Sequence, residues 1–277
     1  MDNSTIIYPT DFSECAENAM QYAMAIAKAM KCEVLIVYSV DVSNIVKQDE
    51  NPVRVMEEIQ LQEGKAKNGL RKIKREMEAN DIVCNTEILK DSGISWLPEY
   101  IEKQKPYLVV MGTTGSGSLE KKLFGSNTYR VITKTHFPLL VVPKDAIFKG
   151  FEKMIFATDF EQKDTENIEF LIKIARHYKA SIDVVNVTET AFESEEEKVH
   201  IDTLKNELSK TNRYGNMQYK FLRWDNVEER LEILLKESNA NLLALVNKKK
   251  SFIDRLFYKS IVKKMVYRTK IPLLIFS

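Results

Sequence analysis

The chain carries the same ordered sequence patterns twice, and this repeat limits the folds open to it more than any other feature. Residues 6–12 (IIYPTDF) and residues 154–160 (MIFATDF) each join an apolar stretch to Thr-Asp-Phe. Near the end of each half, FPLL at residues 137–140 is matched by IPLL at residues 271–274. Two matching anchors in the same order predict a tandem duplication. We therefore predict two domains, residues 1–146 and 147–277.

Short apolar stretches alternate with amphipathic ones in both halves, which predicts strands and helices in turn. In the first half, strands are predicted at Thr5–Tyr8, Glu33–Val40, Val83–Leu89, Leu108–Met111 and Leu139–Val142, and helices at Glu14–Met30, Val53–Asn80, Ile94–Lys103 and from Gly125 onward. In the second half, residues 154–160 match the end of the first strand and the Thr-Asp-Phe that follows it. Further strands are predicted at Ser181–Val187, Met217–Arg223, Asn241–Val246 and Ile271–Phe276, and helices at Glu195–Thr211 and Val227–Lys236. The polar stretch from Asp41 to Pro52 is predicted to be a loop. This order is typical of an α/β fold in which each domain has an open, mostly parallel five-stranded sheet with helices on both faces.

A glycine-rich segment joins the fourth predicted strand of the first half to the next helix. Gly112, Gly115, Gly125 and Ser126 follow the spacing G-x2-G-x9-G-S. Glycines let backbone N–H groups approach phosphate oxygens, and a helix start offers unpaired donors at the positive end of its dipole. The spacing is neither a P-loop nor G-x-G-x-x-G. It favours a nucleotide site, and the alternative is a tight turn with no ligand.

The chain resembles the universal stress protein family in its tandem, two-domain form. The resemblance rests on PTDFSECAENAMQYAMAIAK at residues 9–28 and on the motif from Gly112 to Ser126, which matches the ATP signature of that family without a gap. It implies a Rossmann-like fold of the adenine nucleotide alpha hydrolase-like type, with ATP, alone or with Mg²⁺, as cofactor. It also implies a binding site made of Thr10, Asp11, Ser39, Val40, Met111, Gly112, Gly115, Gly125, Ser126 and Asn127.

Within this site the resemblance implies that Asp11 contacts adenine and that the glycines with Ser126 hold ribose and phosphates. A carboxylate accepts from an amino group, and backbone N–H groups with a Ser hydroxyl satisfy phosphate oxygens. The alternative for Asp11 is a turn or capping residue, which is common for Asp after a strand. The two interpretations are compatible. Ser13 is predicted to cap the helix that follows.

The second half departs from the motif. LVNKKKSFIDRLFYKS at residues 245–260 stands where the first half has MGTTGSGSLEKKLFGS, and no motif glycine survives. Side chains with a Cβ prevent the same backbone approach to phosphate. Asp159 remains, but we expect one competent site, in the first domain. Lys248, Lys249 and Lys250 form either an anion site or a solvated loop.

The composition, with 44% hydrophobic and 29% charged residues, is typical of an ordinary soluble globular protein. The net charge of +1 gives no basic field for nucleic acid, and no apolar run approaches the length of a membrane span. Three scattered cysteines and three scattered histidines show neither a disulfide framework nor metal-ligand spacing. The N-terminal stretch lacks the features of a signal peptide. We expect a cytoplasmic location and no partnership with nucleic acid or membrane.

The sequence favours a binder over an enzyme. No lysine occupies the P-loop position, and Glu120 is the acidic residue within the glycine motif, so at most slow ATP hydrolysis is expected. The predicted function is a stress-response regulator that binds ATP. The alternative is a scaffold or interaction protein with a vestigial site. The resemblance also implies an intramolecular pseudo-dimer through the last strand of each domain, and leaves a homodimer open.

Overall fold

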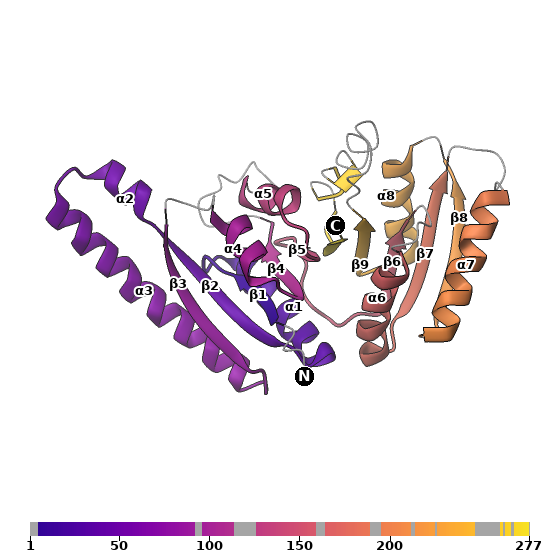
Figure 1. Ribbon diagram of the computed structural model, residues 1–277, viewed down its shortest axis with the longest axis horizontal. Helices are drawn as coiled ribbons and strands as arrows, with labels where there is room; N and C mark the ends of the chain where they lie inside the picture. Colours follow the sequence, from indigo (N-terminus) through magenta and orange to yellow (C-terminus); the bar gives the residue numbers. More distant parts are fainter. Residues whose placement is uncertain are drawn as a thin grey trace. The chain divides into compact units, whose positions relative to one another are not determined.

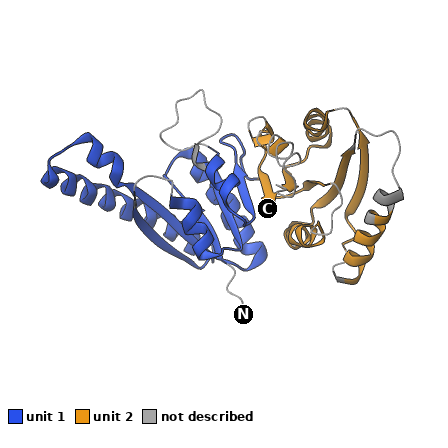
Figure 2. Ribbon diagram, turned by 45° about the horizontal axis from the view of Figure 1, so that its top comes forward, with its two compact units in different colours: residues 1–148 blue, residues 149–277 orange. Residues whose placement is uncertain are grey.

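The computed structural model describes residues 5–91, 96–113, 126–158, 164–188, 195–211, 214–224, 226–246, 261–262, 264–266 and 269–276. The chain divides into two compact units, residues 1–148 and residues 149–277 (Figure 2). This boundary lies two residues beyond the predicted end of the first domain.

Unit 1 is an open parallel sheet with helices on both faces (Figure 1). Its elements are β1 (Thr5–Pro9), α1 (Glu14–Met30), β2 (Glu33–Asp41), α2 (Val42–Gln48), α3 (Pro52–Glu78), β3 (Cys84–Asp91), α4 (Leu97–Gln104), β4 (Leu108–Gly112), α5 (Ser126–Lys134) and β5 (Leu139–Val142). The strand order is β3-β2-β1-β4-β5, and every pair is parallel. The order reverses between β1 and β4, and open sheets bind ligands at the carboxyl ends of the strands beside such a reversal.

Unit 2 has the same architecture. Its elements are β6 (Lys153–Ala157), α6 (Asp164–Tyr178), β7 (Ser181–Thr188), α7 (Glu195–Thr211), β8 (Met217–Arg223), α8 (Val227–Ser238), β9 (Leu242–Val246) and β10 (Leu273–Phe276). The strands are ordered β8-β7-β6-β9-β10 and are all parallel. The predicted α/β fold with parallel strands and helices is confirmed.

Backbone hydrogen bonds define which residues of the two units are equivalent. The amide of Tyr107 donates to the carbonyl of Thr5, and in unit 2 the amide of Asn241 donates to the carbonyl of Lys153, both at 2.9 Å. Thr5 and Lys153 also begin the first strand of each unit and pair with the first residue of the next strand. Once Thr5 is matched with Lys153, the strand pairings show which other residues of the two units correspond to each other.

The two faces of the unit 1 sheet are covered by different helices. Tyr8 points toward α1, because its hydroxyl donates to the carbonyl of Ala16 at 2.7 Å. Ile7 faces the other way, since successive side chains on a strand alternate. A hydrogen bond from the side-chain amide of Gln21 to the Glu76 carboxylate joins α1 to α3. Helix α4 contacts α5 instead. Alanines along α1 are buried, which lets this helix lie close to the sheet.

One predicted loop is a helix. The stretch after Asp41 forms α2, whose N-terminus is capped by the Asp41 carboxylate accepting from the amide of Asn44 at 3.0 Å. The loop prediction was wrong because α2 buries no residue against the sheet and so lacks a strong apolar stripe. Figures 1 and 2 show α2 and the start of α3 extending beyond the sheet. Of the remaining boundaries, those of α1, β5, α7 and β8 match the prediction to the residue.

Candidate functional site

The carboxyl ends of β1, β2 and β4 bring most of the predicted site residues to one edge of unit 1. Neighbouring parallel strands end at the same edge of a sheet, and these three are neighbours. Described residues at this edge are Thr10, Asp11, Ser39, Val40, Met111 and Gly112. Gly115 and Gly125 lie outside the described residues. Ser126 and Asn127 are the first two residues of α5.

The start of α5 is held against the end of β4. Thr128, in the first turn of the helix, is 2% exposed, and its hydroxyl donates to the carbonyl of Gly112 at 3.0 Å. The amide of Thr113 donates to the carbonyl of Val142 at 3.0 Å, which continues the pairing of β4 with β5 past Gly112. The N–H groups of the helix start, which have no partners within the helix, therefore lie beside the end of a parallel strand, an arrangement suited to an anion.

Gly112 is also required by the packing of α1. A Cβ added to Gly112 would lie 2.7 Å from the sulfur of Cys15 and 3.0 Å from its carbonyl carbon and oxygen. Cys15 is buried, and its thiol donates to the carbonyl of Val142 at 3.4 Å. Because a real Cβ almost never approaches atoms so closely, only glycine lets α1 sit against this strand end. The sequence motif gave no sign of this second role.

The turn from β1 to α1 is organised by Asp11. One carboxylate oxygen accepts from the backbone amide of Ser13 at 3.1 Å and from its hydroxyl at 2.6 Å. Ser13 in turn accepts from the amide of Ala16, so the predicted N-cap is confirmed. Asp11 is thus a turn residue, as one interpretation held.

Two aromatic rings, those of Phe12 and Tyr38, stack on each other near this edge. Phe12 has a left-handed backbone, with φ of 62°, and its ring stacks on Tyr38 at a centroid distance of 4.8 Å. The ring also fills the space left by Gly69 on α3, where a Cβ would lie 2.6 Å from it. Burial raises the pKa of Tyr38, and the negative charge of Asp11 raises it further. The sequence did not predict this cluster, because Phe12, Tyr38 and Gly69 lie in three separate parts of the chain: the turn after β1, strand β2 and helix α3.

Trp96 directly precedes α4, and its side chain contacts Ser39 near the end of β2. Its indole N–H donates to the hydroxyl oxygen of Ser39 at 3.1 Å. The ring is half-buried and makes an edge contact with Tyr100, with centroids 5.4 Å apart. Ser39 was among the predicted site residues, whereas Trp96 was not, because it lies 57 residues away along the chain.

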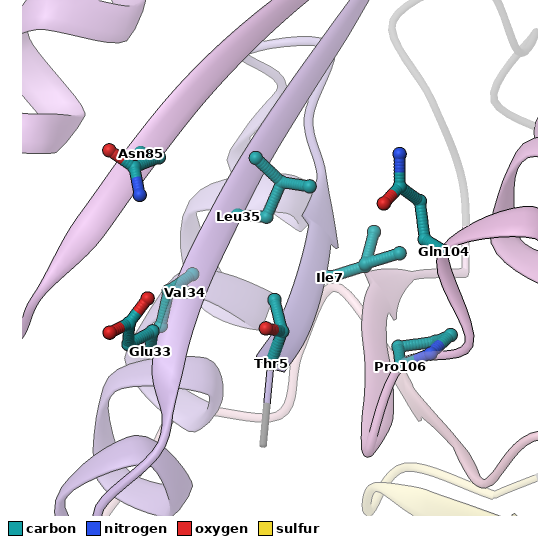
Figure 3. A pocket seen from close by; sticks show the side chains of 8 residues that line it. All are labelled: Thr5, Ile7, Glu33, Val34, Leu35, Asn85, Gln104 and Pro106. Atoms are coloured by element: carbon teal, nitrogen blue, oxygen red, sulfur yellow. The ribbon is translucent and has the colours of Figure 1, made fainter. Parts of the chain in front are cut away.

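A cavity of about 160 Å³ lies at the other end of the strands, away from the candidate site (Figure 3). Ile7 and Leu35 contribute apolar side chains to it, and Thr5, Glu33, Asn85 and Gln104 contribute polar ones. In the described parts of the chain, no group of three His, Cys, Asp or Glu side chains is arranged to hold a metal ion. Nor is any helix in those parts long and apolar enough to cross a membrane.

Comparison with known proteins identifies what the chain is similar to. The sequence profile of the Universal stress protein family matches residues 3–143 and residues 150–277. Universal stress protein MJ0531 of Methanocaldococcus jannaschii is 39% identical over 140 residues, covering 50% of this chain and 81% of that protein. Universal stress protein MJ0577 of the same organism is 29% identical over 152 residues, covering 50% and 94%. The crystal structure of a universal stress protein from Archaeoglobus fulgidus superposes with a TM-score of 0.78 at 13% identity, covering 100% and 99%.

Proposed function

Since the chain belongs to the universal stress protein family, we propose that it binds an adenine nucleotide, ATP, at the carboxyl edge of unit 1. We further propose that it acts as a stress-response regulator in the cytoplasm rather than as an enzyme. In this role, the bound nucleotide alters the surface that the protein offers to a partner.

One observation carries the proposal: the start of α5 is hydrogen-bonded to the end of β4 at Gly112, beside the ends of β1 and β2. Helix-start N–H groups suit the phosphates, and the groups on β1 and β2 lie at the same edge for the base. Asp11 supplies an acceptor that suits an amino group, and the Ser39 hydroxyl supplies a donor. Ser126 and Asn127, as the first residues of α5, supply N–H groups toward the phosphates.

The chemistry of these residues supports binding more than catalysis. Glycines, backbone amides, two serines and an aspartate hold and orient a nucleotide. Fast hydrolysis requires in addition a group that positions water and charges that stabilise the transferred phosphoryl group. The site as assigned has neither, so we expect ATP hydrolysis on the order of 10⁻⁴ to 10⁻³ s⁻¹ or slower, as for a GTPase without its activating protein.

Unit 2 lacks the same phosphate cradle in sequence. Val246 ends β9 at the position equivalent to Gly112. A side chain there prevents close backbone approach. We therefore propose one nucleotide per chain.

The test is calorimetric titration of the full chain with ATP and Mg²⁺. We expect one site per chain, lost in Gly115→Val and retained in Gly64→Val. Gly64 is a suitable control because a Cβ at this position meets nothing within 4 Å. Two sites per chain would contradict the assignment of unit 2. No binding at millimolar ATP would overturn the proposal.

An interaction role without nucleotide is the second candidate. It is favoured by apolar side chains exposed on α2 and the start of α3, namely Val46 (51% exposed), Val53 (66%) and Met56 (55%). The two helices contact each other, and exposed apolar side chains on adjoining elements often mark a binding surface. If the titration shows no nucleotide binding, the interaction role replaces the nucleotide-binding role as the proposed function.

A further inference from the structure

We infer that Trp96 is a positioning residue of the nucleotide site, which fixes the Ser39 hydroxyl as a hydrogen-bond donor and thereby favours adenine over guanine. The inference rests on the proposed function and extends it from nucleotide binding to base selection. It starts from the indole N–H of Trp96, which lies 3.1 Å from the Ser39 oxygen.

The direction of this hydrogen bond is not ambiguous. An indole N–H only donates, so the Ser39 oxygen must accept. A serine hydroxyl has a single proton and two acceptor lone pairs, and otherwise rotates to suit its neighbours. With one lone pair engaged by Trp96, the hydroxyl proton of Ser39 is directed elsewhere. One lone pair and the proton remain, and we assign the proton to a ligand at the end of β2.

Asp11 supplies the complementary group on the neighbouring strand. Pro9 pairs with Val37, and Asp11 and Ser39 each lie two residues beyond that pair. Asp11 is an acceptor and Ser39 is a donor, so the two strand ends offer one group of each kind. Adenine presents an amino donor next to a ring-nitrogen acceptor on its pairing edge. Guanine presents a carbonyl acceptor next to an N–H donor, which is the reverse order.

Trp96 is itself well placed to hold this geometry. It lies directly before α4, and its ring rests edge-on against Tyr100 in that helix. An indole N–H cannot cap a helix start, because the backbone groups exposed there are donors as well. The indole N–H of Trp96 donates to Ser39 instead. The hydrogen bond therefore links the start of α4 to the strand end at which we place the base.

Unit 2 provides a natural contrast. Val187 stands at the position equivalent to Ser39, because the amides of Thr10 and Thr158 donate to Val37 and Val185 respectively. The second tryptophan of the chain, Trp224, donates to Glu229 at 3.2 Å instead. It is 40% exposed, and the Arg230 guanidinium lies over its ring at 5.7 Å. Trp224 is therefore a matched control for Trp96.

The experiment measures ATP and GTP affinity by calorimetry on the full chain for wild type, Trp96→Phe, Ser39→Ala, the double variant and Trp224→Phe. We expect Trp96→Phe to lower the ATP-to-GTP affinity ratio about fivefold, the equivalent of one hydrogen bond near 1 kcal/mol. Ser39→Ala should lower it equally, and the double variant should lower it no further, as for two members of one interaction. Trp224→Phe should leave the ratio unchanged.

The outcomes separate this inference from the proposed function. Wild type that binds neither nucleotide would overturn both. Wild type that binds ATP, with the same ATP-to-GTP ratio in Trp96→Phe and Ser39→Ala, would overturn the inference alone. A ratio that falls additively in the double variant would also overturn it, because independent effects do not require the hydrogen bond. If Trp96→Phe does not fold, Ser39→Ala still tests the role of the hydroxyl.

Discussion

The two units build the same backbone around different side chains, and the amino ends of their strands show this most clearly. In unit 1, Thr5 and Leu35 border a cavity of about 160 Å³. In unit 2 the equivalent residues are Lys153 and Asp183. Asp183 is 2% exposed. Its carboxylate forms an ion pair with Lys153 at 3.2 Å and accepts a hydrogen bond from Lys220 at 2.7 Å. Unit 2 therefore places an ion cluster where unit 1 has a hollow.

The carboxyl ends of the strands also carry different polar contacts in the two units. In unit 1, the Tyr8 hydroxyl donates to the carbonyl of Ala16, and Gly112 leaves room for α1. In unit 2, Phe156 replaces Tyr8 and has no hydroxyl. The Thr158 hydroxyl donates instead to the carboxylate of Asp164, at the position equivalent to Ala16.

The shared scaffold therefore depends on backbone pairing and apolar burial, whereas each cluster of polar side chains is specific to its own unit. A buried polar group is tolerated when a partner satisfies it, whichever partner the sequence supplies. The units can therefore keep one fold while one of them keeps the glycine edge and the other loses it. Four substitutions test this view.

The largest effect is expected at the ion cluster of unit 2. Asp183→Ala leaves two lysine ammonium groups without their shared carboxylate, and should lower the free energy of unfolding of this unit by about 3 kcal/mol. Lys153 and Lys220 are 28% and 33% exposed, which places the cost at the low end for a buried pair. Denaturant unfolding with hydrogen exchange in β6, β7 and β8 measures it.

Two variants sharpen the test of the ion cluster. Asp202→Ala removes an exposed carboxylate that lies 3.8 Å from Lys205, and should change stability little. The triple change Lys153→Met, Asp183→Leu and Lys220→Met should recover most of the lost stability, because an apolar set of similar volume replaces the charges. Equal stability of Asp183→Ala and Asp202→Ala would show that the cluster contributes nothing.

The next effect is expected at the glycine edge of unit 1. Gly112→Ala brings a Cβ within 2.7 Å of the Cys15 sulfur and 3.0 Å of Cys15 backbone atoms, and should cost about 2 kcal/mol. The control Gly64→Ala lies in an open position of α3 and should stabilise the protein by about 0.5–1 kcal/mol. Both are measured by thermal unfolding. A neutral Gly112→Ala would contradict the packing role of this glycine.

A smaller effect is expected where the units carry different aromatic rings. Tyr8→Phe, which copies Phe156, removes the bond to Ala16 and should cost about 1 kcal/mol near neutral pH. Burial raises the pKa of the Tyr8 phenol, so folding favours its neutral form. The stability from this tyrosine is therefore present below the unfolded-state pKa of about 10, and is lost as pH rises through the higher folded-state value. Unfolding curves between pH 7 and pH 11 should show the wild-type advantage shrinking above pH 10.

The smallest effect is expected from copying Lys153 into unit 1. Thr5→Lys places an ammonium group opposite Glu33, its cross-strand neighbour, and should stabilise unit 1 by about 0.5 kcal/mol. The gain should vanish when Glu33→Gln is added. A loss of stability in Thr5→Lys would show that the cavity cannot accept the side chain. Thermal unfolding of the three proteins measures the difference.

The sequence by itself determined the repeated α/β order, the parallel sheets and the single intact glycine motif. These follow from apolar periodicity and from residue identity at fixed spacing, which are local properties. Ser13 as the cap of α1 is also local, since a cap bonds to an amide three residues away. The polar stretch that forms α2 marks the limit of such reasoning, because a helix without a buried face leaves no apolar periodicity to detect.

Only the tertiary structure decided which side chains meet at the site. Gly112 meets Cys15, Phe12 fills the space at Gly69, and Trp96 bonds Ser39, and each contact joins elements that are far apart in the sequence. The cavity beside Thr5 and the ion cluster around Asp183 likewise depend on which side chains the strand register places opposite one another. The physical reason is that periodicity shows which face of an element is buried, whereas packing decides the neighbour that it is buried against.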